Sequence, residues 1–245
     1  MDNVAVISDI HGNIPALEAV LADIKNRKIE LIVCLGDIIG KGPGSSEAVD
    51  IISKECNVVI RGNWDDYIAH HDEGGSIGWY RRQLGRERLN YLRNLPLSHE
   101  FFLSGRLVSL FHAHPQNVYK RVFPHHPLED RLGMFQHSLE YDTAVGKVDI
   151  AGYGDIHGTY LQNIRGKLLF NTGSVGNPLD FTMASYAILK GDYQQREEGN
   201  FSLEFVRVEY DIELAVSQAK EIDLPEREAY INELRTGIYR GRKDK

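Results

Sequence analysis

The chain has 245 residues, 42% of them hydrophobic, and its 28 basic against 35 acidic side chains give a net charge of −7 at pH 7. An acidic balance argues against broad affinity for nucleic acids or anionic membranes, both of which attract basic surfaces. The 2 cysteines form no Cys-x-x-Cys pair, so neither a zinc knuckle nor a disulfide framework is expected. No signal region opens the sequence and no apolar stretch approaches membrane-spanning length, which makes a cytoplasmic location the default expectation.

The first third alternates between strand and helix patterns. Residues 3–8 (NVAVIS), 31–36 (LIVCLG) and 57–62 (NVVIRG) are short apolar runs typical of strands that are covered on both faces. Apolar residues at helical spacing fill 14–28 after the first run and 45–55 after the second. This order predicts a parallel sheet with crossover helices.

The second half lacks helical spacers between its apolar runs. Strand patterns occupy 106–114, 148–154, 167–173, 185–191 and 202–210, with hairpin turns expected at 165–166 and 192–200. We therefore expect mostly antiparallel structure stacked behind the first sheet. Segments at about 66–100 and 116–146 are interpreted as inserts that cover one face, and 211–245 as a helical tail with a break near Pro225. Because no low-complexity linker interrupts the chain, residues 1–245 are predicted to form one domain.

Carboxylates, imidazoles and amides follow six of the predicted strands. Open α/β sheets bind ligands outside the carboxyl ends of their strands, so these groups are expected to meet in one place. The tetrapeptide DIHG supplies two of the sets, at residues 9–12 and 155–158. The full set is Asp9, His11, Asp37, Asn63, His112, His114, Asp155, His157, Asn171 and Ser174.

This mixture of oxygen and nitrogen donors predicts a metal site. Asp, His and Asn together suit Mn²⁺, Fe or Zn²⁺ better than Ca²⁺, which prefers oxygen ligands alone. In Asp-x-His the first and third side chains of an extended segment lie on the same side, so both can reach one ion. The donors outnumber the needs of one ion and favour a centre of two metals. Singly, Asp37 could be a helix cap, His112 a core histidine and Asn63 a turn residue; together, at ordered strand ends, these structural explanations are improbable.

The sequence resembles the calcineurin-like metallophosphoesterase family. The matching motifs are SDIHGN, GDIIGKGP, GNWDD, FHAHP, GYGDIHG and NTGSVGNP, in the family's order from residue 4 to about 210. Within the family the chain is similar to small bacterial phosphodiesterases, including asymmetric diadenosine-tetraphosphate hydrolases. The resemblance implies an α/β fold, a four-layer αββα sandwich of two mixed sheets whose inserts cover the active-site face. It also implies one metal ion held by Asp9, His11, Asp37 and His157, and a second held by Asp37, Asn63, His112 and the residue at position 155.

The chain departs from the family pattern at two positions. The family motif is Gly-His-x-His where this chain has Gly-Asp-Ile-His, so the second DIHG resembles a metal motif whose first histidine is replaced by Asp155. Asp155 is predicted to ligate the second metal, with contact through water, or a weakened site, as the alternatives. Trp64 stands where many members have a histidine that helps to protonate the leaving group, and indole does not titrate. Good leaving groups should therefore be favoured.

Supporting roles are assigned to residues around this centre. His114 is predicted to be a substitute acid, with an orienting role as an equal alternative. Asn63 is expected to touch the phosphate, while Asn171 and Ser174 are expected to support the ligands. His125 and His126 could reach substrate phosphate or be ordinary loop. The aromatic residues of one insert could stack on a nucleobase or simply form its core: Trp64, Tyr67, Trp79 and Tyr80.

The sequence thus predicts a metal-dependent phosphoesterase. A water activated by two divalent ions, with Mn²⁺ expected and Fe, Zn²⁺ or Ni²⁺ as alternatives, would attack a phosphodiester or phosphoanhydride of a small, nucleotide-type substrate. No stable nucleic-acid or membrane partner is expected, and the oligomeric state is left open. The alternatives are a metal-binding regulatory protein with little catalysis and a phosphoprotein phosphatase.

Overall fold

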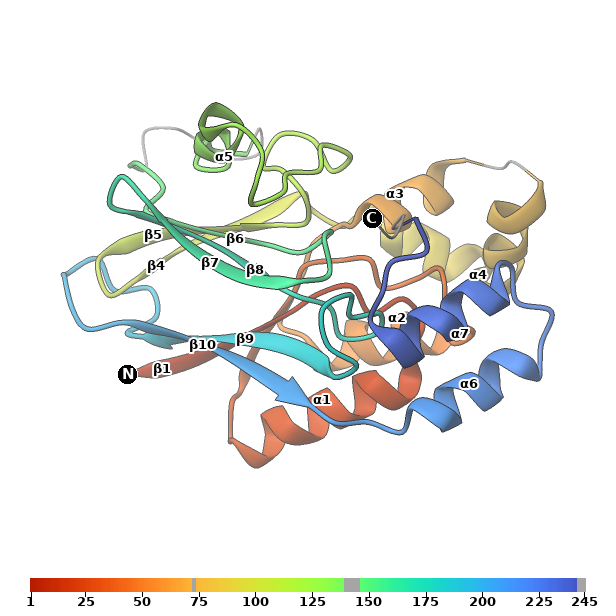
Figure 1. Ribbon diagram of the computed structural model, residues 1–245. Helices are drawn as coiled ribbons and strands as arrows, with labels where there is room; N and C mark the ends of the chain where they lie inside the picture. Colours follow the sequence, from red (N-terminus) through yellow and green to blue (C-terminus); the bar gives the residue numbers. More distant parts are fainter. Residues whose placement is uncertain (72–73, 139–145, 242–245) are drawn as a thin grey trace.

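Two five-stranded sheets stack face to face in the computed structural model, which describes residues 1–71, 74–138 and 146–241 (Figure 1). The first sheet has the order β10-β9-β1-β2-β3. Strands β1, β2 and β3 are parallel, as the alternating strand and helix patterns predict, while β9 pairs antiparallel with β1 and β10 pairs antiparallel with β9. These strands are β1 (Asp2–Ile7), β2 (Leu31–Cys34), β3 (Val58–Val59), β9 (Ala184–Gly191) and β10 (Ser202–Val208).

The second sheet has the order β4-β5-β6-β8-β7. The hairpin at 165–166 joins β7 to β8 as predicted, but β5, β6 and β8 run parallel, so the expectation of mostly antiparallel structure is wrong for the centre of this sheet. Among its described residues the connection from β5 to β6 carries only the short helix α5, and β6 is joined to β8 through β7, so neither crossover shows a helical spacer of the usual length. The strands are β4 (Ser98–Leu103), β5 (Arg106–Phe111), β6 (Ile150–Tyr153), β7 (Thr159–Ile164) and β8 (Lys167–Thr172).

Strand β1 lies between two hydrophobic cores. Its side chains alternate, so that Val4 and Val6 enter the core between the sheets, whereas Ala5 and Ile7 face the helices. All four are fully buried. A strand covered on both faces needs an uninterrupted apolar run, which is what residues 4–7 provide.

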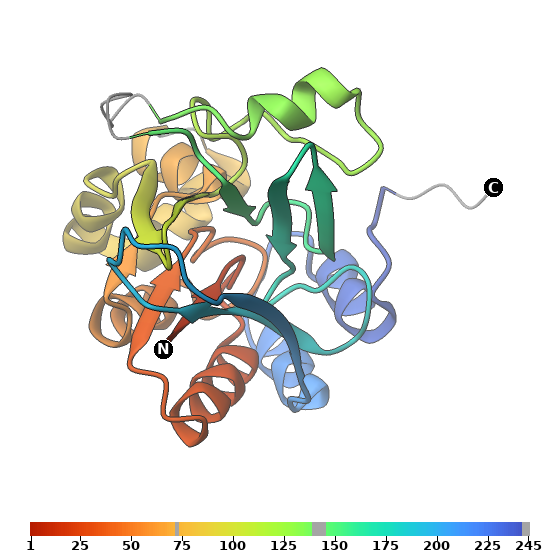
Figure 2. The ribbon, with the colours of Figure 1, turned by 90° about the vertical axis from the view of Figure 1, so that its left-hand side faces the viewer.

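Helices form the outer layers. Figures 1 and 2 show α1 on the outside of the first sheet and α5 on the outside of the second, which gives the αββα sandwich that the resemblance implies. Helices α6 and α7 follow β10 and are separated near Pro225, as expected for the tail. Helix α4 lies against α2, where Arg88 pairs with Asp50. The helices are α1 (Ile14–Asn26), α2 (Ser45–Glu55), α3 (Asn63–His70), α4 (Gly75–Arg93), α5 (Leu128–Gly133), α6 (Ile212–Lys220) and α7 (Arg227–Thr236).

Candidate metal centre

The predicted ligands converge at the carboxyl ends of strands from both sheets. Asp9 and His11 follow β1, Asp37 follows β2, His112 follows β5, and His157 lies in the turn after β6. Each of these residues is at most 3% exposed. The two DIHG segments therefore face one another across the sheets, as the sequence predicts.

The loops that carry these groups have unusual backbone geometry. Asp9, His11, Asp37, Asp155 and His157 all have positive φ, between 48° and 65°. Non-glycine residues in this left-handed region are uncommon and strained, and they persist where the surrounding structure holds them for function. The backbone is also closely packed here, because a Cβ added to Gly36 would lie 2.2 Å from the backbone nitrogen of Gly62.

A first group of donors comprises Asp9, His11 and His157. Asp9 Oδ1 lies 3.3 Å from His157 Nε2 and 3.9 Å from His11 Nε2. The two imidazole Nε2 atoms are 3.2 Å apart. This group could hold a metal ion.

A second group comprises Asp9, Asp37 and His112, and it too could hold an ion. Asp37 faces both groups, because its Oδ1 lies 3.5 Å from His112 Nε2 and its Oδ2 lies 3.6 Å from His11 Nε2. Asn63 Oδ1 adjoins the second group at 2.9 Å from His112 Nε2. Asp9 belongs to both groups, and Asp37 places one carboxylate oxygen toward an imidazole of each.

The orientation of the imidazoles fits metal binding. The Nδ1 atoms of His11, His112 and His157 donate to the backbone carbonyls of Ile39, Leu35 and Asn177 at 3.1, 3.0 and 2.5 Å. A carbonyl only accepts, so each Nδ1 carries the proton and each Nε2 lone pair points into the centre. Asp9 Oδ1 is buried and makes no hydrogen bond within the described residues. A cation would satisfy both the lone pairs and this oxygen.

The charges of the centre also favour a cation. Burial raises the pKa of the Asp37 carboxyl well above its usual value, and the neighbouring Asp9 adds to the effect. Burial alone would lower the pKa of His112, but Asp37 and Asp9 outweigh it and raise that pKa to about 9. The acidic groups therefore draw a positive charge into the site, which a metal ion can supply.

Asn171 and Ser174 lie behind the ligands. Ser174 Oγ donates to the carbonyl of Asp9 at 2.7 Å and accepts from the backbone nitrogen of Asn177 at 2.8 Å. The Asn171 side chain donates to the carbonyl of Gly154 and accepts from Gly173. These bonds fix the backbone of two ligand-bearing loops.

Asp155 is close to the centre but has a different partner. Its Oδ1 lies 3.9 Å from His112 Nε2, and both of its carboxylate oxygens accept from Arg121, at 2.8 Å from Nε and 2.7 Å from Nη2. Arg121 is not among the residues that the sequence motifs indicate. It lies in an irregular segment without a motif, so only the tertiary structure connects it to the centre.

The remaining candidates lie farther out. His114 accepts from the backbone of Gln116 through Nδ1, and burial lowers its pKa to about 4, with Lys120 as a further cause. His125 and His126 pack against Phe123, with ring centroids 5.4 Å apart in both cases. His114, His125 and His126 are all outside the two groups that could hold an ion.

Trp64 lies at the edge of the centre. Its ring contacts the His11 ring edge to face at 5.9 Å, and its backbone nitrogen donates to Asp37 Oδ1 at 2.8 Å. Two hollows of about 360 Å³ each adjoin it. One contains Arg121, Phe123, His157 and Tyr239, and the other contains Asn63, Tyr67 and Tyr119. Tyr67 thus lines a hollow beside the centre.

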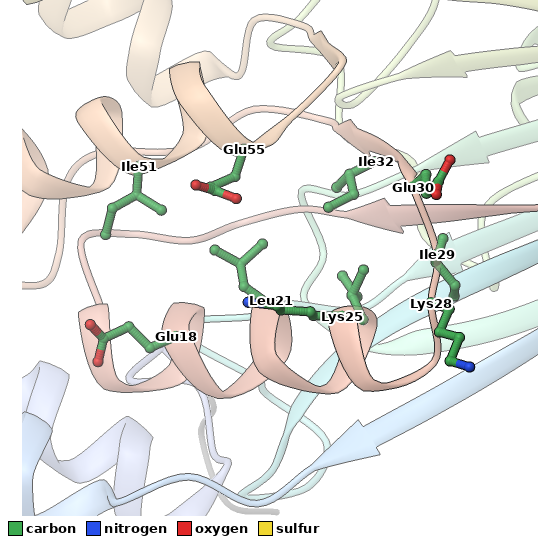
Figure 3. Close-up of a pocket in the computed structure, with 10 residues that line it drawn as sticks. Glu18, Leu21, Lys25, Lys28, Ile29, Glu30, Ile32, Ile51 and Glu55 are labelled. Atoms are coloured by element: carbon green, nitrogen blue, oxygen red, sulfur yellow. The ribbon is translucent and has the colours of Figure 1, made fainter.

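A larger hollow of about 680 Å³ lies elsewhere, between α1, α2 and the start of β2 (Figure 3). Its charged lining residues include Glu18, Lys25 and Glu55. It contains none of the predicted ligands. Volume alone therefore does not identify the reactive site.

Comparison with known proteins decides the family. A model of the calcineurin-like phosphoesterase superfamily domain matches residues 3–194. The chain belongs to this superfamily. The resemblance found in the motifs is thereby confirmed, and a hydrolase that acts on phosphoesters is the activity that the family suggests.

The matches to individual relatives extend over nearly the whole length of the chain. An uncharacterized protein of Methanocaldococcus jannaschii is 33% identical and covers 91% of this chain and 94% of its own. A crystal structure of a metallophosphoesterase from Sphaerobacter thermophilus is 26% identical with a TM-score of 0.75, covering 97% of this chain and 99% of its own. A hypothetical protein of Pyrococcus horikoshii is 25% identical with a TM-score of 0.76, and both chains are covered completely.

Within residues 1–71, 74–138 and 146–241, no helix is both long and apolar enough to cross a bilayer.

Proposed function

We propose that this protein is a metal-dependent phosphoesterase that hydrolyses phosphodiester or phosphoanhydride bonds of a small, nucleotide-type substrate. The observation that carries the proposal is the position of Asp37, whose two carboxylate oxygens face the imidazoles of two different donor groups. A carboxylate between two sets of donors is the arrangement that suits a pair of ions.

The ligands are those that the family resemblance implies, and the two donor groups support the assignment. The first ion would be held by Asp9, His11, Asp37 and His157. The second would be held by Asp37, Asn63 and His112, and Asp155 stays a predicted ligand of that ion. Mn²⁺ is the proposed metal because the donor set mixes imidazole nitrogen with carboxylate and amide oxygen.

The chain's own residues prepare the site for phosphoryl chemistry. When bound, two divalent ions supply a nucleophilic water at neutral pH and offset the charge that builds on the phosphoryl group. The amide of Asn63, at the start of α3, can donate to a phosphoryl oxygen while its Oδ1 faces the centre. Burial of the ligands excludes bulk water and strengthens every electrostatic interaction inside the site.

The two hollows beside Trp64 support a substrate with groups on both sides of the phosphorus. A monoester needs room for one substituent, whereas a diester or an anhydride needs room for two. Aromatic side chains line each hollow, Phe123 and Tyr239 in one and Tyr67 and Tyr119 in the other. Such walls suit planar rings, and each volume lies within the range of ligand sites.

Hydrolysis of an aryl phosphodiester by metal-stripped protein tests the proposal. Turnover would be compared across added Mn²⁺, Fe²⁺, Zn²⁺, Ni²⁺ and Mg²⁺, with Asp37→Asn as the matched variant. We expect turnover with Mn²⁺ that the variant lacks. Absence of turnover with every ion, despite bound metal, would contradict an enzymatic function toward this class and favour a metal-binding regulatory protein.

A further inference from the structure

The buried carboxylate of Asp155 is neutralised by an arginine that reaches it from outside. Asp155 is 3% exposed in its side chain, whereas Arg121 is 46% exposed. The two parallel hydrogen bonds, 2.8 and 2.7 Å long, use both carboxylate oxygens. Bidentate pairs of this kind are strong and fix the plane of the guanidinium. Without Arg121, a largely desolvated charge would lack its closest partner.

The side chain of Asp155 lies beside the two donor groups and belongs to neither. Both groups that could hold an ion include Asp9 but not Asp155. The backbone nitrogen of Asp155 instead donates to Asp9 Oδ2 at 3.1 Å. Asp155 thus supports Asp9 through its backbone and holds Arg121 through its side chain.

The guanidinium keeps a free edge beside the centre. Its Nε and Nη2 bind Asp155, while Nη1 makes no hydrogen bond within the part of the chain that is described. Arg121 lines the same hollow as His157 and Trp64. A cation with unused donors is therefore available where a phosphoryl group would lie against the metal ligands.

The segment that carries Arg121 is anchored to the second sheet. Val122 is fully buried, and its carbonyl accepts from the Tyr153 hydroxyl at 2.6 Å. Tyr153 is the last residue of β6, two positions before Asp155. Arginine and aspartate are thus both fixed to the end of one strand, which is the rigid support that a positioned charge requires.

We propose that Arg121 binds the phosphoryl group undergoing transfer and that Asp155 is the positioning residue that aims its guanidinium. This inference rests on the proposed function and offers Asp155 a role other than metal ligation. Arg121 would donate from Nη1 to a non-bridging phosphoryl oxygen, and its charge would complement that of the ions. Arginine suits this role because its fork can hold a carboxylate and still present a donor to phosphate.

Four variants test the proposal: Arg121→Ala, Asp155→Asn, the double variant, and Arg88→Ala as control. Arg88 makes a similar two-bond pair with Asp50 on the far helices, at 2.8 and 2.5 Å, and touches no site residue. The readouts are Mn²⁺ stoichiometry and affinity by calorimetry, binding of inorganic phosphate to the Mn²⁺-loaded protein, and kcat and KM for an aryl phosphodiester.

We expect Arg121→Ala to bind Mn²⁺ as the wild type does but to bind inorganic phosphate at least about 10-fold more weakly and to lose about 10²–10³-fold in kcat/KM. Asp155→Asn should change the same quantities in the same direction, and the double variant should lose no more than Arg121→Ala, because the two residues act as one unit. Added guanidinium, at a low, non-denaturing concentration, should partly restore turnover in Arg121→Ala but not in the double variant. Arg88→Ala should change none of them.

Other outcomes would overturn the proposal. Loss of one Mn²⁺ in Asp155→Asn, with Arg121→Ala unaffected in phosphate binding, would make Asp155 a metal ligand. Unchanged phosphate binding in Arg121→Ala with a lowered melting temperature would reduce the pair to a structural role. If the wild type binds phosphate but turns over no ester, the phosphate measurement still decides the role of Arg121, and the proposed function alone fails.

Discussion

Asp9 Oδ1 lies 3.3 Å from His157 Nε2, although Asp9 follows β1 of the first sheet and His157 follows β6 of the second. The two sheets therefore contribute opposite walls of one centre, and the centre exists only when they are stacked. Metal binding should consequently be coupled to the stability of the whole sandwich, because ions that bind the folded chain shift the folding equilibrium.

Metal binding should raise the melting temperature. At a Mn²⁺ concentration about 100 times the Kd, linkage gives about 2.7 kcal/mol, which is about 5–10 °C for a chain of this size. Metal-free Asp37→Asn should be at least as stable as the metal-free wild type, since burial raises the pKa of the Asp37 carboxyl and disfavours its charged form. Its melting temperature should rise less with Mn²⁺ than that of the wild type. Scanning calorimetry with and without chelator would show this, and an equal increase in both proteins would contradict the ligand assignment.

Ser174→Ala should weaken both the fold and the centre. It removes the hydroxyl between the Asp9 carbonyl and the Asn177 nitrogen and leaves both buried groups without that partner. We expect a loss of about 1–3 kcal/mol in unfolding free energy and of about 10–100-fold in Mn²⁺ affinity. Ser46→Ala, which removes one exposed hydrogen bond to Gln83, is the control and should stay within about 0.5 kcal/mol. Denaturant titration and calorimetry measure the two effects; metal affinity that stays at the wild-type value would argue against a supporting role for Ser174.

Trp64→His should broaden the range of leaving groups. An imidazole at this position can donate a proton, whereas indole cannot release one, so esters with poor alkyl leaving groups should gain up to about 10²-fold relative to aryl esters. Trp64→Phe is the matched control, because it removes the indole without adding a titratable group. The comparison is the ratio of kcat/KM for the two ester types, and a ratio equal in both variants would mean that position 64 does not govern protonation.

Acid should weaken the hydrogen bonds through which Asp180 connects Thr159 of β7 to Arg207 of β10. Burial raises the pKa of Asp180, but its hydrogen bonds from Arg207 and from the Thr159 backbone outweigh burial and hold that pKa below its usual value. A lowered folded-state pKa gives stability that is present above the unfolded value of about 3.9 and is lost as pH falls through the folded value. Asp180→Asn should cost about 1 kcal/mol at pH 7 and should flatten the loss of stability below pH of about 4.

The exposed pair of Asp50 and Arg88 is the control for this effect, because solvent screens it. Urea unfolding of wild type, Asp180→Asn and Asp50→Asn between pH 3 and 7 would make the comparison. Identical pH profiles for all three proteins would show that Asp180 contributes nothing to acid sensitivity.

The placement of the ligands could be predicted because it follows from local patterns. Buried runs such as 4–7 can only be strands covered on both faces, and the polar groups that end them must then meet at one edge of the sheets. Local patterns also predict the N-terminal parallel strands, the hairpin at 165–166 and the broken helical tail. Each depends on periodicity or turn residues within a few positions.

Features that depend on distant segments were not predictable in this way. β4 is preceded by a long helix and lies in a stretch interpreted as part of an insert, and β7 is a polar edge strand whose burial alternates weakly. The parallel pairing of β5, β6 and β8 depends on how irregular segments cross the sheet. The pairing of Asp155 with Arg121 joins two loops, and no spacing in the sequence indicates it.

The number of Mn²⁺ ions bound per chain tests the central claim most directly. Metal-stripped protein would be dialysed to equilibrium against Mn²⁺, the bound metal measured by mass spectrometry, and hydrolysis of the aryl phosphodiester followed at each occupancy. The two donor groups, which share Asp9, predict two ions per chain, with turnover that rises as the second ion binds. Saturation at one ion with full activity, or turnover without any bound ion, would contradict the account.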